Sequence, residues 1–212
     1  MFYVSNGLWN LYDLLQDFFS LNEIPGGPVL LLRNWGVYRD EILPTRQREH
    51  KLGLIRPILD PYADLPFILI GDSSEADPEI YATLVQHHPD RILAVYIRSA
   101  SPDPDRVSAI QALAEEVTAA GSELILAEDS LSMAGHAARR GWIPYAALSE
   151  VASAQLRDQS RARSAGRSSR SKSAEEVIGG RGDLDRDTLR STLEDTAEGE
   201  ASALIVHSDE PD

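Results

Sequence analysis

The sequence contains no cysteine and no long hydrophobic run. Without cysteine the chain cannot form disulfide bonds, zinc sites with thiolate ligands or a cysteine nucleophile. No stretch reaches the roughly 20 consecutive apolar residues of a membrane span. Positive charge is also scarce, since 20 Lys and Arg stand against 34 Asp and Glu, a formal net charge of −14. Nonspecific binding to nucleic acid needs a basic surface, so we expect no nucleic-acid partner.

Short apolar runs alternate with amphipathic segments over residues 1–156, and hydrophobic residues, at 42% of the chain, suffice for a core. The apolar runs predict strands at Phe2–Ser5, Val29–Leu32, Phe67–Ile70, Ile92–Ile97 and Leu124–Leu126. The amphipathic segments predict helices at Leu8–Phe19, Gln47–Leu59, from Asp77 onward, at Pro104–Ala120 and in segments up to Leu156. Continuous apolar strands are buried on both faces. The sequence therefore predicts an α/β domain with a Rossmann-like parallel sheet and helices on both faces.

The composition changes near residue 157. From Arg157 to Lys172 there are six basic residues and one acidic residue, and from Glu175 to Asp212 there are twelve acidic and three basic residues. Such charge blocks bury too little apolar surface to offset the entropy of ordering. We therefore predict that residues 157–212 form a disordered charged tail and that residues 1–156 form the folded domain. The basic block could contact an anionic membrane or RNA, and the acidic block could fold back on it, whereas the ordinary interpretation is a solvated tail.

Polar residues follow two of the predicted strands at their carboxyl ends, where open parallel sheets bind ligands. Ser5, Asn6 and Gly7 follow the first strand, and the run Gly71-Asp72-Ser73-Ser74-Glu75-Ala76-Asp77 follows the third. Carboxylate and hydroxyl oxygens gathered at a glycine turn suit Mg²⁺, which takes one or two protein carboxylates together with water and substrate phosphate. The alternative is that Asp72 and Asp77 only cap the following helix, with Asp77 as the N-cap and Pro78 in the first turn.

Lys51 lies on the predicted helix before the third strand. An ammonium group at this place can neutralise a phosphate or a carboxylate. The alternative is a solvated surface lysine, the commoner environment of this residue type.

A serine at a strand end, a lysine on a helix and Gly-Asp-x-x-x-x-Asp after a strand together resemble motifs of the haloacid dehalogenase-like phosphohydrolases. A closer resemblance, over about residues 1–145, is to the catalytic domain of the actin-patch-type phosphatidate phosphatases. Its motifs are Phe2-Tyr3-Val4-Ser5, Trp9-Asn10-Leu11-Tyr12, Pro25-Gly26-Gly27-Pro28, Leu32-Arg33-Asn34-Trp35-Gly36, His50-Lys51, Ile70-Gly71-Asp72-Ser73, Asp77-Pro78-Glu79-Ile80-Tyr81, Arg91-Ile92, Tyr96-Ile97-Arg98, His136-Ala137-Ala138 and Gly141-Trp142-Ile143.

The resemblance implies Mg²⁺-dependent hydrolysis of a phosphomonoester through an aspartyl-phosphate. Ser5 would then bind the transferring phosphoryl group, and Lys51 would neutralise its charge. Asp72 and Asp77 would form the acidic magnesium site, and Asn6 and Gly7 would face the substrate. The substrate would be a phosphorylated small molecule or a phospholipid headgroup, as in lipid metabolism. The location implied is the cytoplasm, with peripheral membrane contact left open.

One family motif is absent from this sequence. The resemblance implies an Asp-x-Asp-x-Thr motif, carrying the nucleophile and general acid, on a central strand that would lie between the strands of Val4 and Leu69. No such motif occurs in the chain. We therefore expect a sheet without its first central strand, a chain truncated at its N-terminus, and negligible phosphatase activity of the chain alone. The alternative is a non-catalytic protein that binds phosphate or a lipid headgroup on a decayed phosphatase scaffold.

Overall fold

A computed structural model describes residues 1–32, 44–100, 103–175 and 201–206. The chain divides into two compact units, Met1–Glu128 with Leu193–Asp212, and Asp129–Thr192. The domain boundary that the composition predicts, between residues 156 and 157, falls within a helix of the second unit. Of the motif Leu32-Arg33-Asn34-Trp35-Gly36, residues 33–36 lie outside the described residues.

The first unit is built on a six-stranded sheet with the order β2-β1-β6-β3-β4-β5. Its strands are β1 (Phe2–Leu8), β2 (Val29–Leu32), β3 (Phe67–Asp72), β4 (Ile92–Arg98), β5 (Leu124–Ala127) and β6 (Ala201–Val206). The pairs β1–β2, β3–β4 and β4–β5 are parallel. The predicted positions of the first five strands and their parallel arrangement are confirmed.

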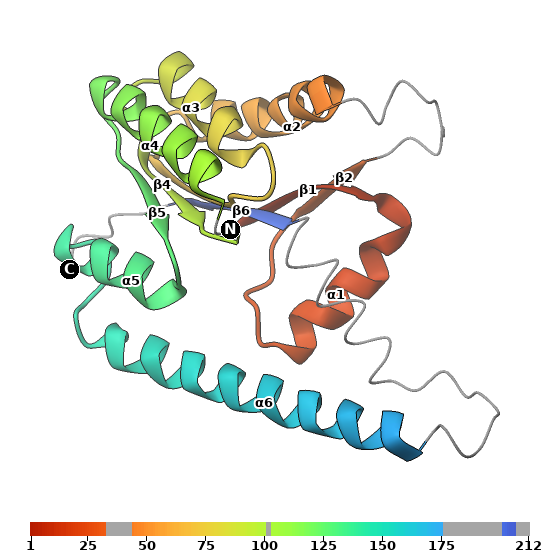
Figure 1. Cartoon of the computed structure of the whole chain (residues 1–212). Coiled ribbons are helices and arrows are strands. Elements are labelled where there is room, and N and C mark those ends of the chain that lie inside the picture. Colours follow the sequence, from red (N-terminus) through yellow and green to blue (C-terminus); the bar gives the residue numbers. More distant parts are fainter. Residues whose placement is uncertain (33–43, 101–102, 176–200, 207–212) are drawn as a thin grey trace. The chain divides into compact units, whose positions relative to one another are not determined.

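Helices cover both faces of this sheet. The helices of the first unit are the short 3-10 turns η1 (Trp9–Leu11) and η2 (Asp60–Tyr62) and the α-helices α1 (Tyr12–Leu21), α2 (Pro44–Leu59), α3 (Asp77–His87) and α4 (Pro104–Ala119). Helices α2, α3 and α4 lie along one face, and α1 lies on the other (Figure 1). Helix α4 ends where Gly121 adopts a φ of +88°, a left-handed conformation that glycine accepts without a steric penalty. The predicted α/β fold class is confirmed.

The core lies between the sheet and helices α2 to α4. Strands β3 and β4 are almost entirely buried, which explains why they read as continuous apolar runs in the sequence. Their side chains pack with fully buried residues of the three helices, among them Ile55, Leu84 and Ile110. This packing fixes the ends of α2 and α3 against the carboxyl end of β3, where the polar residues lie.

Strand β6 occupies the position in the sheet where the sequence analysis expects a missing central strand. It pairs with β1 on one side and β3 on the other, and it is antiparallel to both. The gap among the parallel strands is therefore present, and a segment from near the end of the chain fills it. Residues 201–206 belong to the range 157–212 that the composition assigned to a tail.

The second unit contains helix α5 (Ser130–Arg139) and the 29-residue helix α6 (Ala147–Glu175). Residues 157–175, which the composition also assigned to the tail, are helical in the structure. Ala and Arg, which together make up eleven of the 29 residues of α6, favour helix even where little apolar surface is buried. No helix among the described residues combines the length and the apolar character needed to cross a bilayer.

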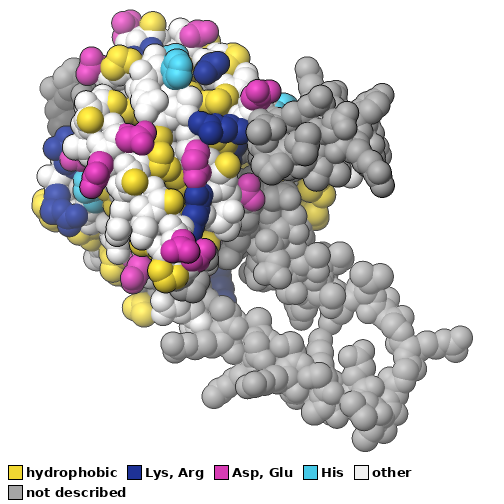
Figure 2. Space-filling model, turned by 45° about the horizontal axis from the view of Figure 1, so that its top comes forward, with side chains coloured by type: hydrophobic (Ala, Val, Ile, Leu, Met, Phe, Trp, Pro, Cys, Tyr) yellow, Lys and Arg dark blue, Asp and Glu magenta, His cyan; other side chains and the backbone are white. Residues whose placement is uncertain are grey.

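Figure 2 shows how charged side chains are distributed over one face of the molecule. Side chains of Lys and Arg lie interspersed there with those of Asp and Glu and with hydrophobic side chains. The described part of this face shows no extended patch of a single sign.

Candidate functional site

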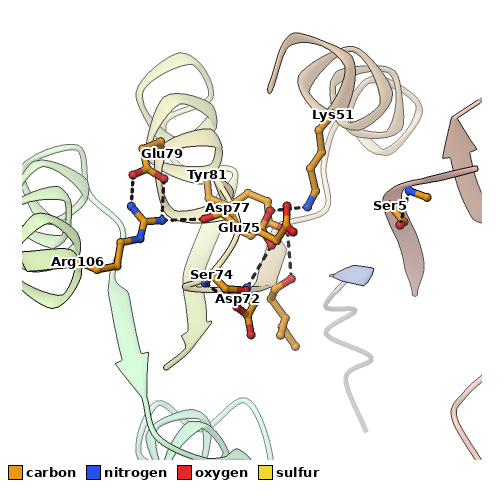
Figure 3. A network of polar contacts seen from close by, with 11 residues as sticks. Ser5, Lys51, Asp72, Ser74, Glu75, Asp77, Glu79, Tyr81 and Arg106 are labelled. Atoms are coloured by element: carbon orange, nitrogen blue, oxygen red, sulfur yellow. Dashed lines mark hydrogen bonds and ion pairs between the residues drawn. The ribbon is translucent and has the colours of Figure 1, made fainter. Parts of the chain in front are cut away.

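A buried ion pair lies at the centre of the candidate site. Lys51, on α2, directs its ammonium group at the carboxylate of Asp77, the first residue of α3, and both side chains are 2% exposed. Figure 3 shows Lys51 reaching from its helix to Asp77. The interpretation of Lys51 as a solvated surface lysine is therefore wrong. Since a charge without a partner is costly in a protein interior, each of the two groups depends on the other.

Asp77 also holds the end of β3. Its second carboxylate oxygen, Oδ2, accepts a hydrogen bond of 3.2 Å from the backbone N–H of Asp72. The residue that precedes the helix is Ala76, so Asp77 is not the N-cap that the sequence predicts. The carboxylate turns away from the helix and toward the strand because Lys51 and the Asp72 N–H attract it there. This part of the alternative, in which Asp77 only caps the helix, is wrong.

Asp72 ends β3 with a carboxylate that is 8% exposed. Its Oδ1 accepts hydrogen bonds of 2.6 Å from both the backbone N–H and the hydroxyl of Ser74. The hydrogen bonds that this carboxylate accepts from described residues both end on Oδ1. Oδ2 is therefore the atom of Asp72 that is best placed to bind a cation.

Arg106, near the start of α4, fixes the loop between β3 and α3. Its guanidinium donates to the carbonyl of Ser73 at 2.8 Å, to the carbonyl of Glu75 at 2.7 Å, and to the carboxylate of Glu79 through both Nη atoms. The sequence analysis did not identify this residue. Its place in the sequence could have indicated this role, because Arg106 lies in the first turn of α4, the helix that follows β4 and begins at the same edge of the sheet as Asp72.

Ser5 lies apart from these residues. It is buried in β1, and its hydroxyl oxygen accepts a hydrogen bond of 2.9 Å from the N–H of Gly7. Figure 3 shows Ser5 to one side of the contacts around Asp77. Strand β6 separates β1 from β3, so the two strands are about 10 Å apart, twice the usual spacing. The structure therefore brings Lys51, Asp72 and Asp77 together, and it places Ser5, with Asn6 and Gly7, on the far side of β6.

The donor set of the site is compatible with Mg²⁺ but sparse. Among the described residues, no group of three or more Asp, Glu, His or Cys side chains has the arrangement of a metal site. Mg²⁺ commonly uses only one or two carboxylates and completes its shell with water and phosphate. Asp72 supplies one such carboxylate, whereas Asp77 already bonds to Lys51 and to the Asp72 N–H. The chemistry of the residues present therefore fits Mg²⁺ through Asp72.

Comparison with known proteins finds a family similarity in the first 99 residues of the chain. Residues 1–99 match the family model of the catalytic domain of phosphatidate phosphatase APP1. Residues 1–99 of the chain are thus similar to this catalytic domain. The matched range contains Ser5, Lys51, Asp72 and Asp77. The resemblance found in the sequence is thereby confirmed, although residues 100–145, over which the sequence analysis extended it, lie outside the match.

Two curated relatives show the extent of the similarity. Phosphatidate phosphatase APP1 of Saccharomyces cerevisiae is 38% identical over 100 residues, and an uncharacterized protein of Schizosaccharomyces pombe is 36% identical over 104 residues. The aligned segments cover 47% and 48% of this chain, and 17% and 16% of the relatives. The chain thus corresponds to a small part of each relative. No solved structure matches the chain significantly.

The ion pair of Glu79 with Arg106 predicts a dependence of stability on pH. Burial raises the pKa of Glu79, but the hydrogen bond and the charge of Arg106 outweigh it, so the pKa lies below its ordinary value. The resulting stabilisation is complete above the pKa of an unfolded glutamate, about 4.3, and is lost as pH falls through the lower folded value. We expect Glu79→Gln to reduce the slope of the free energy of unfolding against pH, measured by denaturation between pH 3 and 6. Glu115→Gln, at an exposed position of α4, should retain the slope, and an equal loss of slope in both variants would contradict the assignment.

Proposed function

We propose that this chain carries the magnesium- and phosphate-binding part of a phosphatidate phosphatase-like phosphomonoester hydrolase. The observation that carries the proposal is the buried contact of Lys51 with Asp77, which in turn binds the N–H of Asp72 at the end of β3. A lysine and two aspartates on three elements meet at the edge of the sheet where α/β proteins bind ligands. The match of residues 1–99 to the catalytic domain supports a phosphatase-like function for this arrangement.

Each residue of the site would contribute by charge and position. Asp72 would hold Mg²⁺ through Oδ2, directly or through water, and Ser74 would keep the carboxylate in this orientation. Lys51 would supply positive charge to a phosphoryl group while Asp77 fixes the ammonium. Bound Mg²⁺ would neutralise the charge on phosphate oxygens, which is the main electrostatic requirement of phosphoryl transfer. Ser5 would contact the phosphoryl group from β1, across the end of β6.

The nucleophile is the part of the reaction that this chain does not supply. Hydrolysis through an aspartyl-phosphate, which the family resemblance implies, requires an Asp-x-Asp-x-Thr sequence, and the chain contains none. We therefore expect the isolated chain to bind Mg²⁺ and phosphate with negligible turnover. The second candidate, a binding protein for phosphate or a lipid headgroup on the same scaffold, is supported by this same observation.

A lipid substrate is supported by the residues that follow β1. Trp9 and Tyr12 are 52% and 44% exposed, and both types of side chain prefer the interface between water and bilayer. The name of the yeast relative specifies phosphatidate as substrate. We accordingly propose a phospholipid headgroup as the bound phosphate and a cytoplasmic protein with peripheral membrane contact.

The proposed function is tested by binding rather than by turnover. In isothermal titration, we expect Mg²⁺ to bind the chain, and Asp72→Asn to weaken binding at least tenfold, because the variant replaces a carboxylate with a neutral amide. Ser5→Ala should leave Mg²⁺ affinity within threefold and weaken binding of phosphate, offered as inorganic phosphate or as phosphatidate in phosphatidylcholine vesicles. Equal Mg²⁺ affinities of the wild type and Asp72→Asn would contradict the site. Rapid hydrolysis of phosphatidate by the isolated chain, removed by Asp72→Asn, would show that the chain supplies its own nucleophile.

A further inference from the structure

Strand β6 differs from the other strands of the sheet in its direction and in its position in the sequence. Every other pair of neighbouring strands in the described sheet is parallel, whereas β6 runs antiparallel to both of its neighbours. It is also the last described element, and it follows the whole second unit in the sequence. Figure 1 shows β6, in blue, between the red β1 on one side and β4 and β5 on the other, and β3 is its direct neighbour on that second side. The position between β1 and β3 therefore accepts a strand that does not belong to the parallel series.

The two strands that flank β6 offer continuous backbone for pairing. Phe2, Tyr3, Val4 and Ser5 of β1 lie opposite Leu204, Ala203, Ser202 and Ala201, respectively. On the other side, Phe67, Ile68, Leu69 and Ile70 of β3 lie opposite Val206, Ile205, Leu204 and Ala203. A segment in this position is thus bound along both edges, whereas a strand added to the rim of a sheet is bound along one.

Leaving the position vacant would be unfavourable. Val4, Phe67 and Leu69 are fully buried, so the backbone groups beside them lie in the interior of the unit. Buried N–H and C=O groups without partners cost free energy comparable to a lost hydrogen bond each. Two facing strand edges that would otherwise stay unpaired therefore favour pairing with an extended segment that reaches them.

The covalent connection does not tie β6 closely to its own sheet. Helix α6 ends at Glu175 and β6 begins at Ala201. The intervening residues 176–200 are enough chain to span roughly 80 Å when extended. A flexible connection of this number of residues would give β6 an effective concentration of the order of millimolar. Hence the docking of β6 is an association between two segments, and it can be competed.

We propose that the position between β1 and β3 is a strand-acceptor site, in which β6 is a separable occupant that the same segment of a second copy of this chain can replace. The contacts in both cases are identical, because the acceptor strands and the inserted segment are the same. In both cases the inserted segment binds as an extended six-residue strand, through hydrogen bonds between backbone groups. This proposal does not depend on the function of the site.

Disulfide trapping tests the proposal on the full chain. Because the chain contains no cysteine, Val4→Cys introduces a single thiol, and this residue lies opposite Ser202 in the sheet. Directly opposed Cα atoms are about 4.5–5.5 Å apart, within the range of a disulfide. We add a synthetic peptide of residues 199–208 that carries cysteine at position 202. Its adduct with the chain is followed by mass spectrometry under mild oxidation.

The control peptide carries cysteine at position 203 instead. Side chains of neighbouring strand residues point to opposite faces, so this thiol cannot reach residue 4 in the observed register. We expect the position-202 peptide to react at least fivefold faster than the position-203 peptide. Equal rates, as an unfolded or unspecific thiol would give, or no adduct with either peptide, would overturn the proposal.

A second variant examines competition by the chain's own β6. Adding Ala203→Pro to Val4→Cys removes a backbone N–H in the middle of β6 and weakens its pairing. We expect trapping of the position-202 peptide to become at least tenfold faster, with Ser208→Pro as the control outside β6. An unchanged rate in a folded Ala203→Pro chain would show that β6 does not occupy the site. If this variant does not fold, the comparison of the two peptides on Val4→Cys alone still decides.

Discussion

Replacing Lys51 with methionine should lower the free energy of unfolding by about 3–5 kcal/mol, because the substitution leaves the carboxylate of Asp77 buried without its cation. Methionine keeps most of the length of the side chain, so the loss of charge dominates over the loss of packing. Chemical denaturation followed by circular dichroism measures the effect. For a domain of this size, the change corresponds to a fall of the melting temperature by roughly 10 °C.

Two further variants separate the ion pair from general damage to α2. Arg56→Met removes an exposed positive charge from the same helix and should change the stability by less than about 0.5 kcal/mol. Adding Asp77→Asn to Lys51→Met removes the unpaired charge, so the double variant should be more stable than Lys51→Met alone. A double variant that is less stable than either single variant would show that the two residues act independently.

The fold could be predicted from the sequence because its parallel strands are buried on both faces. Phe67–Ile70 and Ile92–Ile97 carry apolar residues at every position, and that pattern has few interpretations other than a central parallel strand. The first helix was harder to place, since Leu8 belongs to β1 and the 3-10 turn at Trp9–Leu11 precedes α1. Local periodicity does not reveal how far a strand continues beyond its apolar residues.

Strand β6 was not predicted, although Ala203-Leu204-Ile205-Val206 is an apolar run of the kind that marks the other strands. Residues 201–206 stand in a strongly acidic region, and composition alone assigns such a region to disorder. The apolar run within this region indicates a strand, but its pairing partners are the distant residues 2–5 and 67–70. The sequence of the segment itself does not encode which strands it pairs with.

The candidate site could be predicted in its residues but only partly in its contacts. The order of Lys51, Asp72 and Asp77 in the sequence indicated a shared edge of the sheet, and the structure joins them there. The part played by Arg106 depends on four hydrogen bonds, to two carbonyl oxygens of the loop after β3 and to the carboxylate of Glu79 in α3, and no spacing in the sequence encodes them. Ser5 stands apart for a topological reason, because an additional strand separates its own strand from β3.

The position of Gly71 makes a second strong prediction about this site. A Cβ atom added there would lie 2.7 Å from Cβ and 2.8 Å from Cγ of Asp77, closer than real Cβ contacts allow. Asp77 cannot yield easily, since Lys51 and the Asp72 N–H hold its carboxylate and its backbone begins α3. We therefore expect Gly71→Ala to lower the free energy of unfolding by about 2–4 kcal/mol and to weaken Mg²⁺ binding together with it.

Gly53 provides the matched control for this substitution. It lies inside α2 with no atom within 4 Å of an added Cβ, so Gly53→Ala meets open space. Alanine is better than glycine in the interior of a helix, and this variant should gain about 0.5–1 kcal/mol. The two substitutions add the same methyl group, yet their effects on stability should have opposite signs, because only Gly71 lies against the aspartate that the lysine requires. If Gly71→Ala unfolds at the same denaturant concentration as the wild type, Asp77 can move away from β3, and the close packing of strand, aspartate and lysine is not a requirement of the fold.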